Sequence, residues 1–436
     1  MVYPKSKWHR LGDYVDSSLK GITPKYVDNS NIIVLNQKCI RNNRIDYSLA
    51  RFHDGNKKFS DSKIVRKGDL LFNSTGQGTA GRCAFVNELP KGKKVITDSH
   101  ILILRLGDYH LAECFSYSCF QEEGLIQKFM DGSTGQGELD KLRLFNIEFR
   151  LPETDERKKI CHFLNLIDAK IDLNNKINAE LEAMAKLIYD YWFVQFDFPT
   201  PAEYAQAVGR PEMEGKPYKS SGGKMVYDER LKREIPEGWT RSKFGEYAKV
   251  SSGFAFKSSD WILKGCPVIK IKDITEEGNI DLSDLAFVSE SIAEKAERFE
   301  SKAGDVIIAM TGATIGKFAI IPFSQKPFYI NQRVGLYNLG NNPLQKVPFL
   351  YCSLKQKYVR EQIFLIGSGA AQPNISGEQL DNIQLIGSPP DLISKFNQEN
   401  KPLFKKILLN QDENQQLAAL RDWLLPMLMN GQVKVE

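Results

Sequence analysis

Two stretches of the chain carry apolar residues at alternating spacings of three and four, the pattern of long helices that pair along one face. They cover residues 155–194 and 389–430 and match at an offset of 236 residues. The apolar positions are Ile160, Leu164, Ile167, Ile171, Leu181, Ala185, Ile188 and Trp192 in the first stretch, and Phe396, Leu403, Ile407, Leu417, Leu424 and Leu428 in the second. A helix of about 40 residues would be about 60 Å long, more than one domain of this size can cover. The pattern therefore predicts two long helices.

Asparagine interrupts the apolar seam at the same two places in both stretches. These residues are Asn174, Asn178, Asn410 and Asn414. A buried asparagine in such a seam lowers stability and fixes the register of two helices. Their recurrence favours pairing of the two helices with each other, over an alternative in which each helix packs on its own globular core. Pro402 predicts either a kink or a fresh start in the second helix, and Arg421 interrupts its seam.

The regions that precede the two helices also resemble each other. Residues 8–14 match 239–247, residues 67–76 match 303–312 at an offset of 236, and residues 132–136 match 368–372. Asp98 and His100 align with Asn331 and Arg333. Similarity spread in this way indicates duplication of a whole domain together with the helix that follows it.

Short apolar runs inside each repeat predict strands, and two amphipathic runs predict short helices. The strands are expected at 31–35, 69–72, 100–105, 267–272, 305–309 and 318–321, and the short helices at 112–123 and 350–363. The segment between the repeats is rich in Pro, Gly, Lys and Glu, which is typical of a linker. We therefore expect a mixed α+β fold with domains at 1–152 and 237–388, spacer helices at 153–196 and 389–430, and a linker at 197–236.

Composition narrows the class of protein. The chain has 436 residues, 42% hydrophobic and 26% charged, and a net charge of +5. It has enough apolar material for real cores but no apolar run near the roughly 18 residues of a membrane span, so we expect a cytoplasmic protein that does not contact a membrane. Its seven cysteines form no Cys-x-x-Cys pair, and their odd number argues against a closed disulfide framework. The positive charge lies mainly in residues 1–152, a weak indication of an anionic partner.

Known catalytic motifs are not found in the sequence. All five histidines lie within the first 162 residues, so a histidine-based site would not have been duplicated with the domains. Residues 312–318 resemble a phosphate-binding loop but have three residues between the glycines instead of four, and Phe318 where the loop needs a hydroxyl. Glu300 and Lys302 form part of a nuclease signature that lacks its preceding Pro-Asp. We expect no catalytic residue and no metal site.

The duplicated loops rich in glycine and hydroxyl groups, 75–78 and 311–314, suit a binding surface. For each loop taken alone, glycines that merely permit a tight turn are an equally good explanation. If the surface binds DNA, the glutamines suit adenine, and Arg44 and Arg333 suit guanine. Backbone N–H groups, Arg82 and Lys317 suit phosphates. The candidate DNA-binding residues are Lys20, Lys25, Arg44, Gln77, Arg82, Gln136, Lys257, Lys270, Lys272, Thr314, Lys317, Gln332, Arg333 and Gln372.

Several segments together resemble the specificity subunits of type I restriction–modification enzymes. They are residues 151–160, 167–177, 191–197, 215–225 leading into 235–239, and 424–432. The resemblance runs over nearly the whole chain, as recognition domain, long helix, recognition domain and long helix. One departure is residues 389–395, where the family usually has an acidic run followed by Glu-Gln.

The resemblance implies that each globular domain reads one half of a split, asymmetric site in double-stranded DNA. It also implies that the helices pair as an antiparallel coiled coil that sets the half-site spacing and docks modification subunits. The chain itself would be a non-catalytic subunit without a cofactor. Modification subunits would bring methylation of adenine by S-adenosylmethionine, and restriction subunits would bring ATP and Mg²⁺ for translocation and cleavage.

Two other functions remain open from the sequence. The duplicated domains can instead bind protein or carbohydrate on a coiled-coil scaffold, with no role for DNA. A nuclease that acts alone is the third hypothesis, and it predicts that this chain cuts DNA with magnesium and no other subunit.

Overall fold

The computed structural model describes residues 7–76, 78–131, 137–229, 231–275, 278–282, 284–367 and 374–436. Three candidate DNA-binding residues, Gln77, Gln136 and Gln372, lie outside these ranges. The chain divides into two compact units. Unit 1 comprises residues 1–170 and 417–436, and unit 2 comprises residues 171–416. Each unit therefore contains one globular domain and one segment of each long helix.

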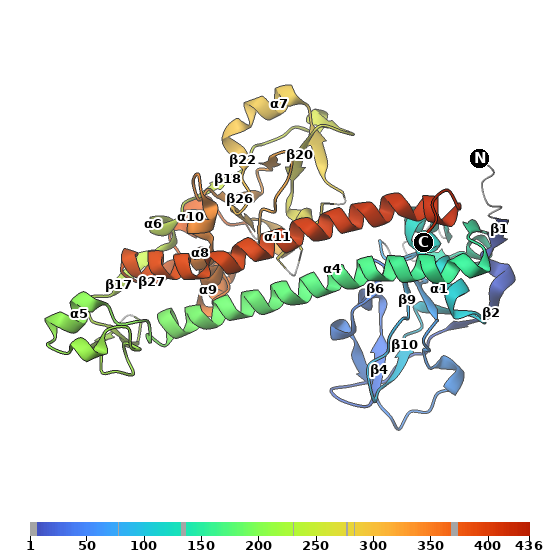
Figure 1. Ribbon diagram of the computed structural model, residues 1–436, viewed down its shortest axis with the longest axis horizontal. Coiled ribbons are helices and arrows are strands. Elements are labelled where there is room, and N and C mark those ends of the chain that lie inside the picture. The colour runs from blue at the N-terminus through green and yellow to red at the C-terminus, as the bar shows by residue number, and fades with distance from the viewer. Residues whose placement is uncertain are drawn as a thin grey trace. The chain divides into compact units, whose positions relative to one another are not determined.

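Unit 1 is built on two four-stranded sheets, in the orders β2-β11-β8-β9 and β10-β4-β7-β3 (Figure 1). The strands described in unit 1 are β1 (Lys7–Arg10), β2 (Val15–Lys20), β3 (Tyr26–Val27), β4 (Ile32–Leu35), β5 (Ile40–Arg41), β6 (Arg44–Ile45), β7 (Arg51–His53), β8 (Leu70–Asn73), β9 (Cys83–Phe85), β10 (Lys94–Thr97), β11 (Ile101–Leu106), β12 (Met130–Asp131), β13 (Glu138–Leu139) and β14 (Glu148–Leu151). The short α-helices are α1 (Tyr109–Gln121), α2 (Glu123–Ile126) and α3 (Lys141–Phe145).

Unit 2 repeats this plan, with sheets in the orders β18-β26-β23-β24 and β19-β21-β20-β25-β22. The strands described there are β15 (Met225–Asp228), β16 (Arg233–Pro236), β17 (Thr240–Lys243), β18 (Val250–Ser252), β19 (Trp261–Ile262), β20 (Cys266–Ile269), β21 (Ala286–Val288), β22 (Glu300–Ser301), β23 (Val306–Ala309), β24 (Phe318–Ile320), β25 (Phe328–Ile330), β26 (Val334–Tyr337) and β27 (Gln384–Gly387). The short α-helices are α5 (Ala202–Ala207), α6 (Phe244–Tyr247), α7 (Glu290–Lys295), α8 (Val347–Leu354), α9 (Lys357–Gly367) and α10 (Gly377–Asp381).

The central strands are buried on both faces, which explains why they read as continuous apolar runs. Successive side chains of β8 point to opposite faces, so Leu70 and Phe72 enter one core with α1 while Leu71 enters another. In unit 2, Val306 and Ile307 of β23 divide between two cores in the same way.

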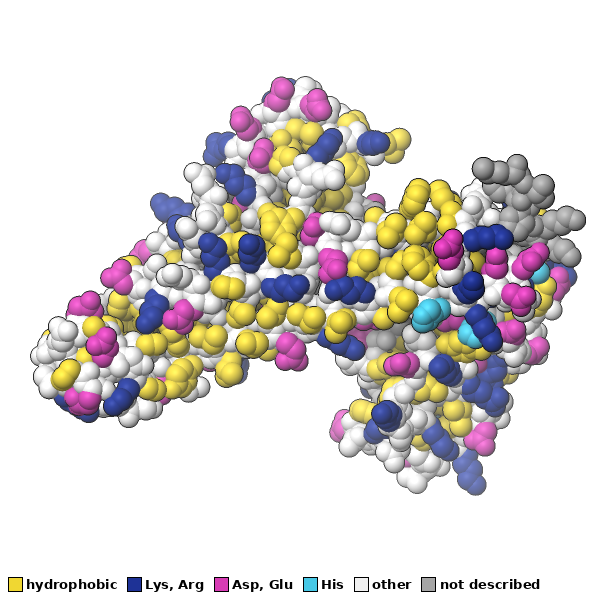
Figure 2. Space-filling model, in the orientation of Figure 1, with side chains coloured by type: hydrophobic (Ala, Val, Ile, Leu, Met, Phe, Trp, Pro, Cys, Tyr) yellow, Lys and Arg dark blue, Asp and Glu magenta, His cyan; other side chains and the backbone are white. Residues whose placement is uncertain are grey.

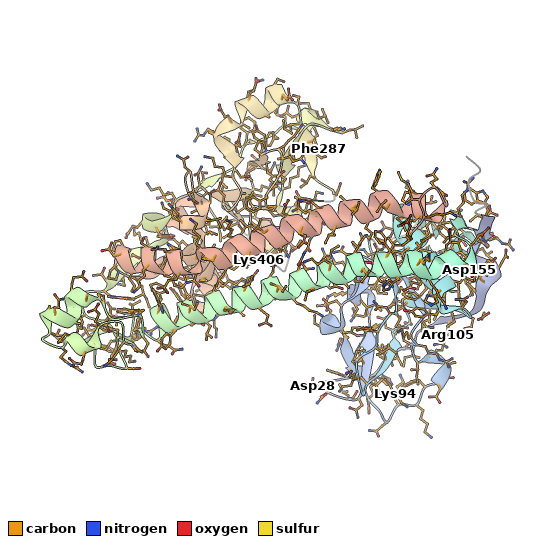
Figure 3. The ribbon with its side chains drawn as sticks, viewed as in Figure 1. Asp28, Lys94, Arg105, Asp155, Phe287 and Lys406 are labelled. Carbon is orange, nitrogen blue, oxygen red and sulfur yellow. The ribbon has the colours of Figure 1, made fainter. Side chains whose placement is uncertain are left out.

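A buried aspartate marks the same turn in both units. The Asp69 carboxylate accepts a hydrogen bond from the N–H of Arg66 (2.8 Å) and pairs with Arg105 (2.9 Å), which is labelled in Figure 3. Burial raises the pKa of Asp69, and its hydrogen bond and charge contact with Arg105 oppose that rise. Asp305 instead accepts from the N–H groups of Lys302 (2.8 Å) and Leu339 (3.0 Å). The two repeats thus keep a backbone turn and differ in the side chains around it.

The two long helices are α4 (Thr154–Tyr189), followed by a π-helical turn (Asp190–Val194), and α11 (Pro390–Met429). In unit 2 the Asn174 amide donates to Asn414 (2.9 Å), and the Asn410 amide donates to Asn178 (2.8 Å). Because residue numbers rise along one helix as they fall along the other, the helices are antiparallel. The expected mixed α+β fold, with two similar domains and a pair of long antiparallel helices, is confirmed.

Helix α11 continues through Pro402, so the fresh start considered for this helix is not observed. Pro402 is exposed, while Phe396 and Phe404 on either side of it are fully buried. Burial of these two rings holds both halves of the helix in the core, which offsets the hydrogen bond that proline cannot donate.

Two expected elements differ in extent from the prediction. The helix expected at 350–363 is broken into α8 and α9, where Lys355 pairs with Glu182 (2.8 Å) and Gln356 bonds to Asp190 (2.9 Å) of the long-helix segment. The strand expected at 267–272 ends at Ile269, because Asp273 accepts a hydrogen bond from the N–H of Lys270 (2.8 Å) and forms a turn. Periodicity does not register such side-chain bonds.

Residues 197–236, which we expected as a linker, contain α5, β15 and β16. Phe198 stacks between Tyr218 (ring centroids 4.7 Å apart) and Trp239 (5.3 Å), and all three belong to the core of unit 2. Aromatic burial therefore gives this segment a packed structure, although its Pro- and Gly-rich composition resembles that of a flexible connection. None of the helices in the described part of the chain combines the length and apolar character needed to cross a membrane.

Candidate nucleic-acid interface

Three segments that are far apart in the sequence meet at one end of the central sheet of unit 1. The N–H of Ser74, after β8, donates to the carbonyl of His100 (2.8 Å), and the N–H of Leu139 donates to the carbonyl of Ser74 (2.7 Å). Thr75 also pairs with Glu138. We call residues 74–76, 98–100 and 138–139 the loop frame of unit 1.

The same arrangement occurs in unit 2. The N–H of Met310 donates to the carbonyl of Arg333 (3.1 Å), the N–H of Ile375 donates to the carbonyl of Met310 (2.9 Å), and Thr311 pairs with Asn374. Residues 310–314, 331–333 and 374–375 form the loop frame of unit 2. Backbone hydrogen bonds hold both frames, so their shape depends little on the exposed side chains.

One polar side chain fixes the tip of each frame. The Asp98 carboxylate accepts from the N–H of His100 (3.0 Å), and the Asn331 carbonyl oxygen accepts from the N–H of Arg333 (3.4 Å). Burial raises the pKa of Asp98, and the hydrogen bond from His100 only partly offsets this rise. The frames therefore present different residues from one backbone position, histidine in unit 1 and arginine in unit 2.

The frame of unit 1 carries a polar cluster. The Thr75 hydroxyl accepts a hydrogen bond from the Gln37 amide (2.8 Å) and lies 2.8 Å from Nδ1 of His100. Lys20 forms an ion pair with Glu138. Lys20 is therefore a predicted residue that the structure brings to the frame.

The frame of unit 2 contains three predicted residues. Gln332 and Arg333 are exposed at its tip, and the Thr314 hydroxyl donates to the carbonyl of Thr311 (3.4 Å). Lys317 closes the same turn, because its N–H donates to the carbonyl of Thr314 (3.0 Å). An exposed arginine beside amides and hydroxyls suits hydrogen bonding to base edges and phosphates.

Four other predicted lysines already have partners or neighbours outside the frames. Lys25 pairs with Asp54 (2.8 Å), and Lys272 pairs with Asp284 (2.6 Å), a contact that raises the pKa of Lys272. Lys270 lies over the Trp261 ring at 3.6 Å, and burial lowers the pKa of this lysine. The N–H of Lys257 donates to Asp260 (2.7 Å), and its side chain is exposed.

Two predicted arginines are directed elsewhere. Arg44 lies 3.6 Å from Asp168 of α4, and thus faces the long helices of unit 1. Arg82 closes the turn of the frame through its N–H, which donates to Thr79 (3.2 Å). Its charge, however, lies near Glu123. Burial raises the pKa of the Glu123 carboxyl group, and the charge of Arg82 reduces that rise.

Comparison with known proteins supports this picture of two duplicated domains. Residues 5–183 and 236–400 match the family model described as the type I restriction modification DNA specificity domain. The chain belongs to this family. The resemblance seen in the sequence is therefore confirmed, and the chain is a specificity subunit of the type I restriction–modification class.

Curated relatives extend the match over most of this specificity subunit. It is 23% identical over 452 residues to the HindI specificity subunit of Haemophilus influenzae, covering 92% of this chain and 94% of the relative. It is 26% identical over 330 residues to the MjaIX specificity subunit of Methanocaldococcus jannaschii, covering 74% and 69%. Its fold is similar to that of the S subunit from M. genitalium, with a TM-score of 0.50, 16% identity, and coverage of 97% and 95%.

The sequence did not single out several frame residues of this specificity subunit. His100 appeared only in the alignment of the repeats, and Gln37, Glu138 and Asn374 were not chosen at all. The alignment of Asp98 and His100 with Asn331 and Arg333 pointed to His100 alone, because it marks the same turn in both repeats. Gln37 gave no such signal, since the matching residue in unit 2 is Ile271.

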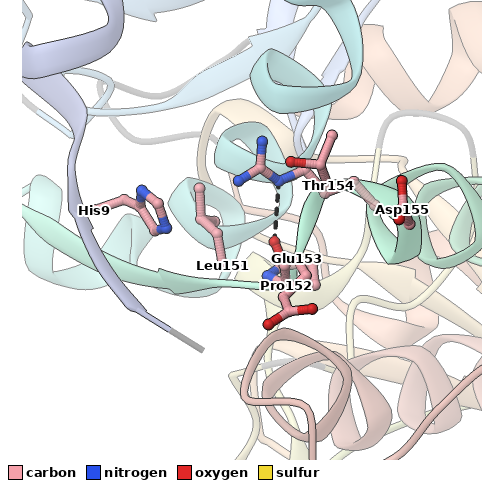
Figure 4. A pocket seen from close by; sticks show the side chains of 7 residues that line it. His9, Leu151, Pro152, Glu153, Thr154 and Asp155 are labelled. Atoms are coloured by element: carbon pink, nitrogen blue, oxygen red, sulfur yellow. Dashed lines mark hydrogen bonds between the residues drawn. The ribbon is translucent and has the colours of Figure 1, made fainter. Parts of the chain in front are cut away.

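Other places in the specificity subunit offer less chemistry. His9 and residues 151–155 and 157 line a pocket where α4 begins (Figure 4). Two of its polar side chains are engaged locally, since Arg157 donates to the carbonyl of Pro152 (3.0 Å) and His9 bonds to the Tyr14 hydroxyl (2.6 Å). Within the described ranges, no group of three or more His, Cys, Asp or Glu side chains is placed to hold a metal ion.

Proposed function

We propose that this specificity subunit reads a bipartite, asymmetric site in double-stranded DNA, with one loop frame directed at each half. The observation that carries the proposal is the duplicated frame: the same hydrogen-bonded backbone carries Thr75 and His100 in unit 1 but Thr311, Gln332 and Arg333 in unit 2. The major groove presents a different pattern of donors and acceptors for each base pair. Unequal side chains on equal frames therefore suit two different half-sites.

The remaining candidate residues fit this function as contacts to the DNA backbone. Lys25, Lys257 and Lys272 are exposed, and positive charge favours contact with phosphates. Thr314 and Lys317 belong to one turn, and a hydroxyl and an ammonium group suit the same role. Gln77, Gln136 and Gln372 adjoin the frames in the sequence, and we retain them as candidates for contacts with bases.

We propose that the paired helices set the distance between the half-sites, with the asparagine contacts fixing their register. The domain boundaries expected from the sequence, at 152, 196, 236 and 388, belong to this proposal. Methylation, translocation and cleavage would be carried out by modification and restriction subunits, with S-adenosylmethionine, ATP and Mg²⁺ bound there, in the cytoplasm.

Gel shifts of the chain with its modification subunits test this function. We expect duplex DNA to bind at low salt and more weakly at high salt, because counterions are released from the phosphates. Mapping of methylated adenines in the host genome should then give a split site with two different halves. If no duplex binds even at low salt, the scaffold hypothesis is favoured instead, and cutting of DNA by this chain alone with magnesium would favour the nuclease hypothesis.

The exposed face of α4 suits docking of a modification subunit. Figure 2 shows hydrophobic side chains along this helix, and the exposed ones in unit 2 are Leu173, Met184, Leu187 and Tyr191. Their positions share one side of the helix at spacings of three, four, seven and eleven. Removing this much apolar surface from water favours association with an amphipathic partner helix.

Replacement of Leu187 by glutamate is expected to weaken binding of the modification subunit. Leu187 is 68% exposed, and burying a leucine contributes about 1.5–3 kcal/mol, so the loss should be at least about 10-fold. Titration of the modification subunit by calorimetry measures it. Leu142→Glu is the control, because Leu142 is 74% exposed and belongs to α3, not to a long helix. Equal affinity of L187E and wild type would contradict docking on this face.

A further inference from the structure

In unit 1 an apolar core joins α1 to both long helices, and beside it lies a group of charged and polar side chains centred on Asp168. The Asp168 carboxylate lies 2.7 Å from Nη1 of Arg421 on α11 and 3.0 Å from the hydroxyl of Tyr117 on α1. Arg44, from the β5–β6 hairpin, approaches it to 3.6 Å. One carboxylate on α4 thus contacts the other long helix and two elements of the globular domain.

A second set of hydrogen bonds extends this network into the domain. The Tyr117 hydroxyl also lies 3.0 Å from Oδ1 of Asn165, and the Asn165 amide donates to Glu113 on α1 (2.7 Å). Glu113 is only 2% exposed. Burial would lower the pKa of Arg421, but the neighbouring charges of Asp168 and Asp422 outweigh it and raise that pKa. Tyr117 and Asp168 each contact more than one group of this network, so the loss of either side chain would affect several contacts at once.

Unit 2 has apolar groups at the positions that match Asp168 and Arg421. The residues that match Asp168 and Arg421 at the offset of 236 are Phe404 and Ala185, and both are fully buried. Tyr351 on α8 packs edge-on against Phe404, with ring centroids 5.3 Å apart. Hydrophobic contact is not directional, whereas ion pairs and hydrogen bonds require particular angles.

The orientation of α1 bears directly on the loop frame of unit 1. Leu111 and Phe115 of α1 share a core with Leu70 of β8 and Leu102 of β11. These two strands lead into Ser74 and follow His100, so the frame is built on the sheet that α1 covers. A rotation of α1 on the long helices would therefore carry the frame with it.

We propose that Asp168 is a positioning residue, which fixes the orientation of the first recognition domain on the helix pair through Arg421 and Tyr117. The inference rests on the proposed function for its effect on DNA reading. The Asp168 and Arg421 side chains are partly buried, with 25% and 26% exposed. An ion pair withdrawn from water contributes little net stability compared with apolar groups of similar volume, but it can specify one geometry. The second recognition domain has no such dependence at the matching positions, because Phe404 and Ala185 are apolar.

The double variant Asp168→Phe with Arg421→Ala tests this, because it copies the residue pair of unit 2 into unit 1. Spin labels are attached at Lys38 and Lys158, which are both exposed in unit 1. The distance between them reports the orientation of the domain on α4 in the absence of DNA. Cys266, which is partly exposed, is first replaced by serine so that it does not take up a label. We expect a broader distance distribution in the variant than in the parent. An unchanged distribution in a folded variant would overturn the proposal.

The effect on reading is measured with modification subunits and duplexes in which the gap between half-sites varies. We expect the variant to bind the preferred gap about 10-fold more weakly, as small misplacements of a site can do, and to discriminate less between gap lengths. Mismatches in the second half-site should retain their wild-type effect. An unchanged gap preference would overturn the positioning role in DNA reading.

Two further variants keep the test interpretable. Tyr117→Phe removes one hydroxyl from the network and is expected to shift both readouts in the same direction by less, even if the double variant folds poorly. Glu182→Gln with Lys355→Gln removes the ion pair that joins α4 to the end of α8 in unit 2, and should leave the first domain unaffected. If the wild-type complex binds no duplex, the proposed function fails, while the label distances still decide whether Asp168 orients the domain.

Discussion

Replacement of Gly21 by alanine is expected to destabilise unit 1 by about 3 kcal/mol, at the upper end of the cost of overpacking a core. A Cβ at this position would overlap the carbonyl oxygens of Thr97 and Asp98. The N–H of Gly21 donates to the carbonyl of Ile101 (3.1 Å), so the glycine cannot move away without breaking a bond of the sheet. Urea denaturation followed by circular dichroism measures the loss.

The chain provides a close control for this variant. Gly124→Ala adds the same methyl group inside α2, where no atom lies within 4 Å of the new Cβ, and should be neutral or slightly stabilising. Gly253→Ala should behave as G21A does, because its Cβ would overlap the carbonyl oxygens of Ile330 and Asn331. Equal stability of G21A and G124A would show that the strands can separate at this point.

Replacement of Arg333 by alanine is expected to weaken DNA binding by about 1–3 kcal/mol, roughly 5- to 150-fold, and to relax selectivity in one half-site only. The side chain is exposed, while its backbone is held on both sides, by Asn331 and by Met310. A guanidinium on a fixed backbone loses little entropy when it binds a guanine edge. Gel shifts with single-base variants of each half-site measure the change.

General loss of charge must be separated from loss of reading. Lys295→Ala, on α7, removes one exposed positive charge from the same unit. We expect it to weaken binding of all duplexes slightly and equally. If R333A and K295A have the same effect on every base variant, Arg333 contributes only charge. His100→Ala should instead alter selectivity in the other half-site.

Arg44 and Arg421 illustrate how a residue's role depends on its partners. From the sequence, Arg44 was a candidate for reading guanine, and Arg421 was an interruption of an apolar seam. In the structure both approach Asp168, on α4. Neither periodicity nor residue type identifies such a partner, because Asp168 is 124 residues from Arg44 in the sequence.

The frame residues illustrate the same limit in the opposite direction. Lys20 and Glu138 were unrelated in the sequence, yet the pairing of Thr75 with Glu138 brings them together. Gln37 reaches Thr75 because β4 ends beside the loop that follows β8. Contacts between loops depend on strand order, which local sequence patterns do not encode.

The sequence by itself determined the long helices, the duplication, most of the central strands and the family. These features rest on local spacing and on comparison of one stretch of chain with another, and both can be read from the order of residues alone. The tertiary structure decided which polar groups meet: the two loop frames, the packed segment at 197–236 and the network around Asp168. These depend on side chains brought together by strand order and helix register, where a bond forms only when distance and angle both permit it.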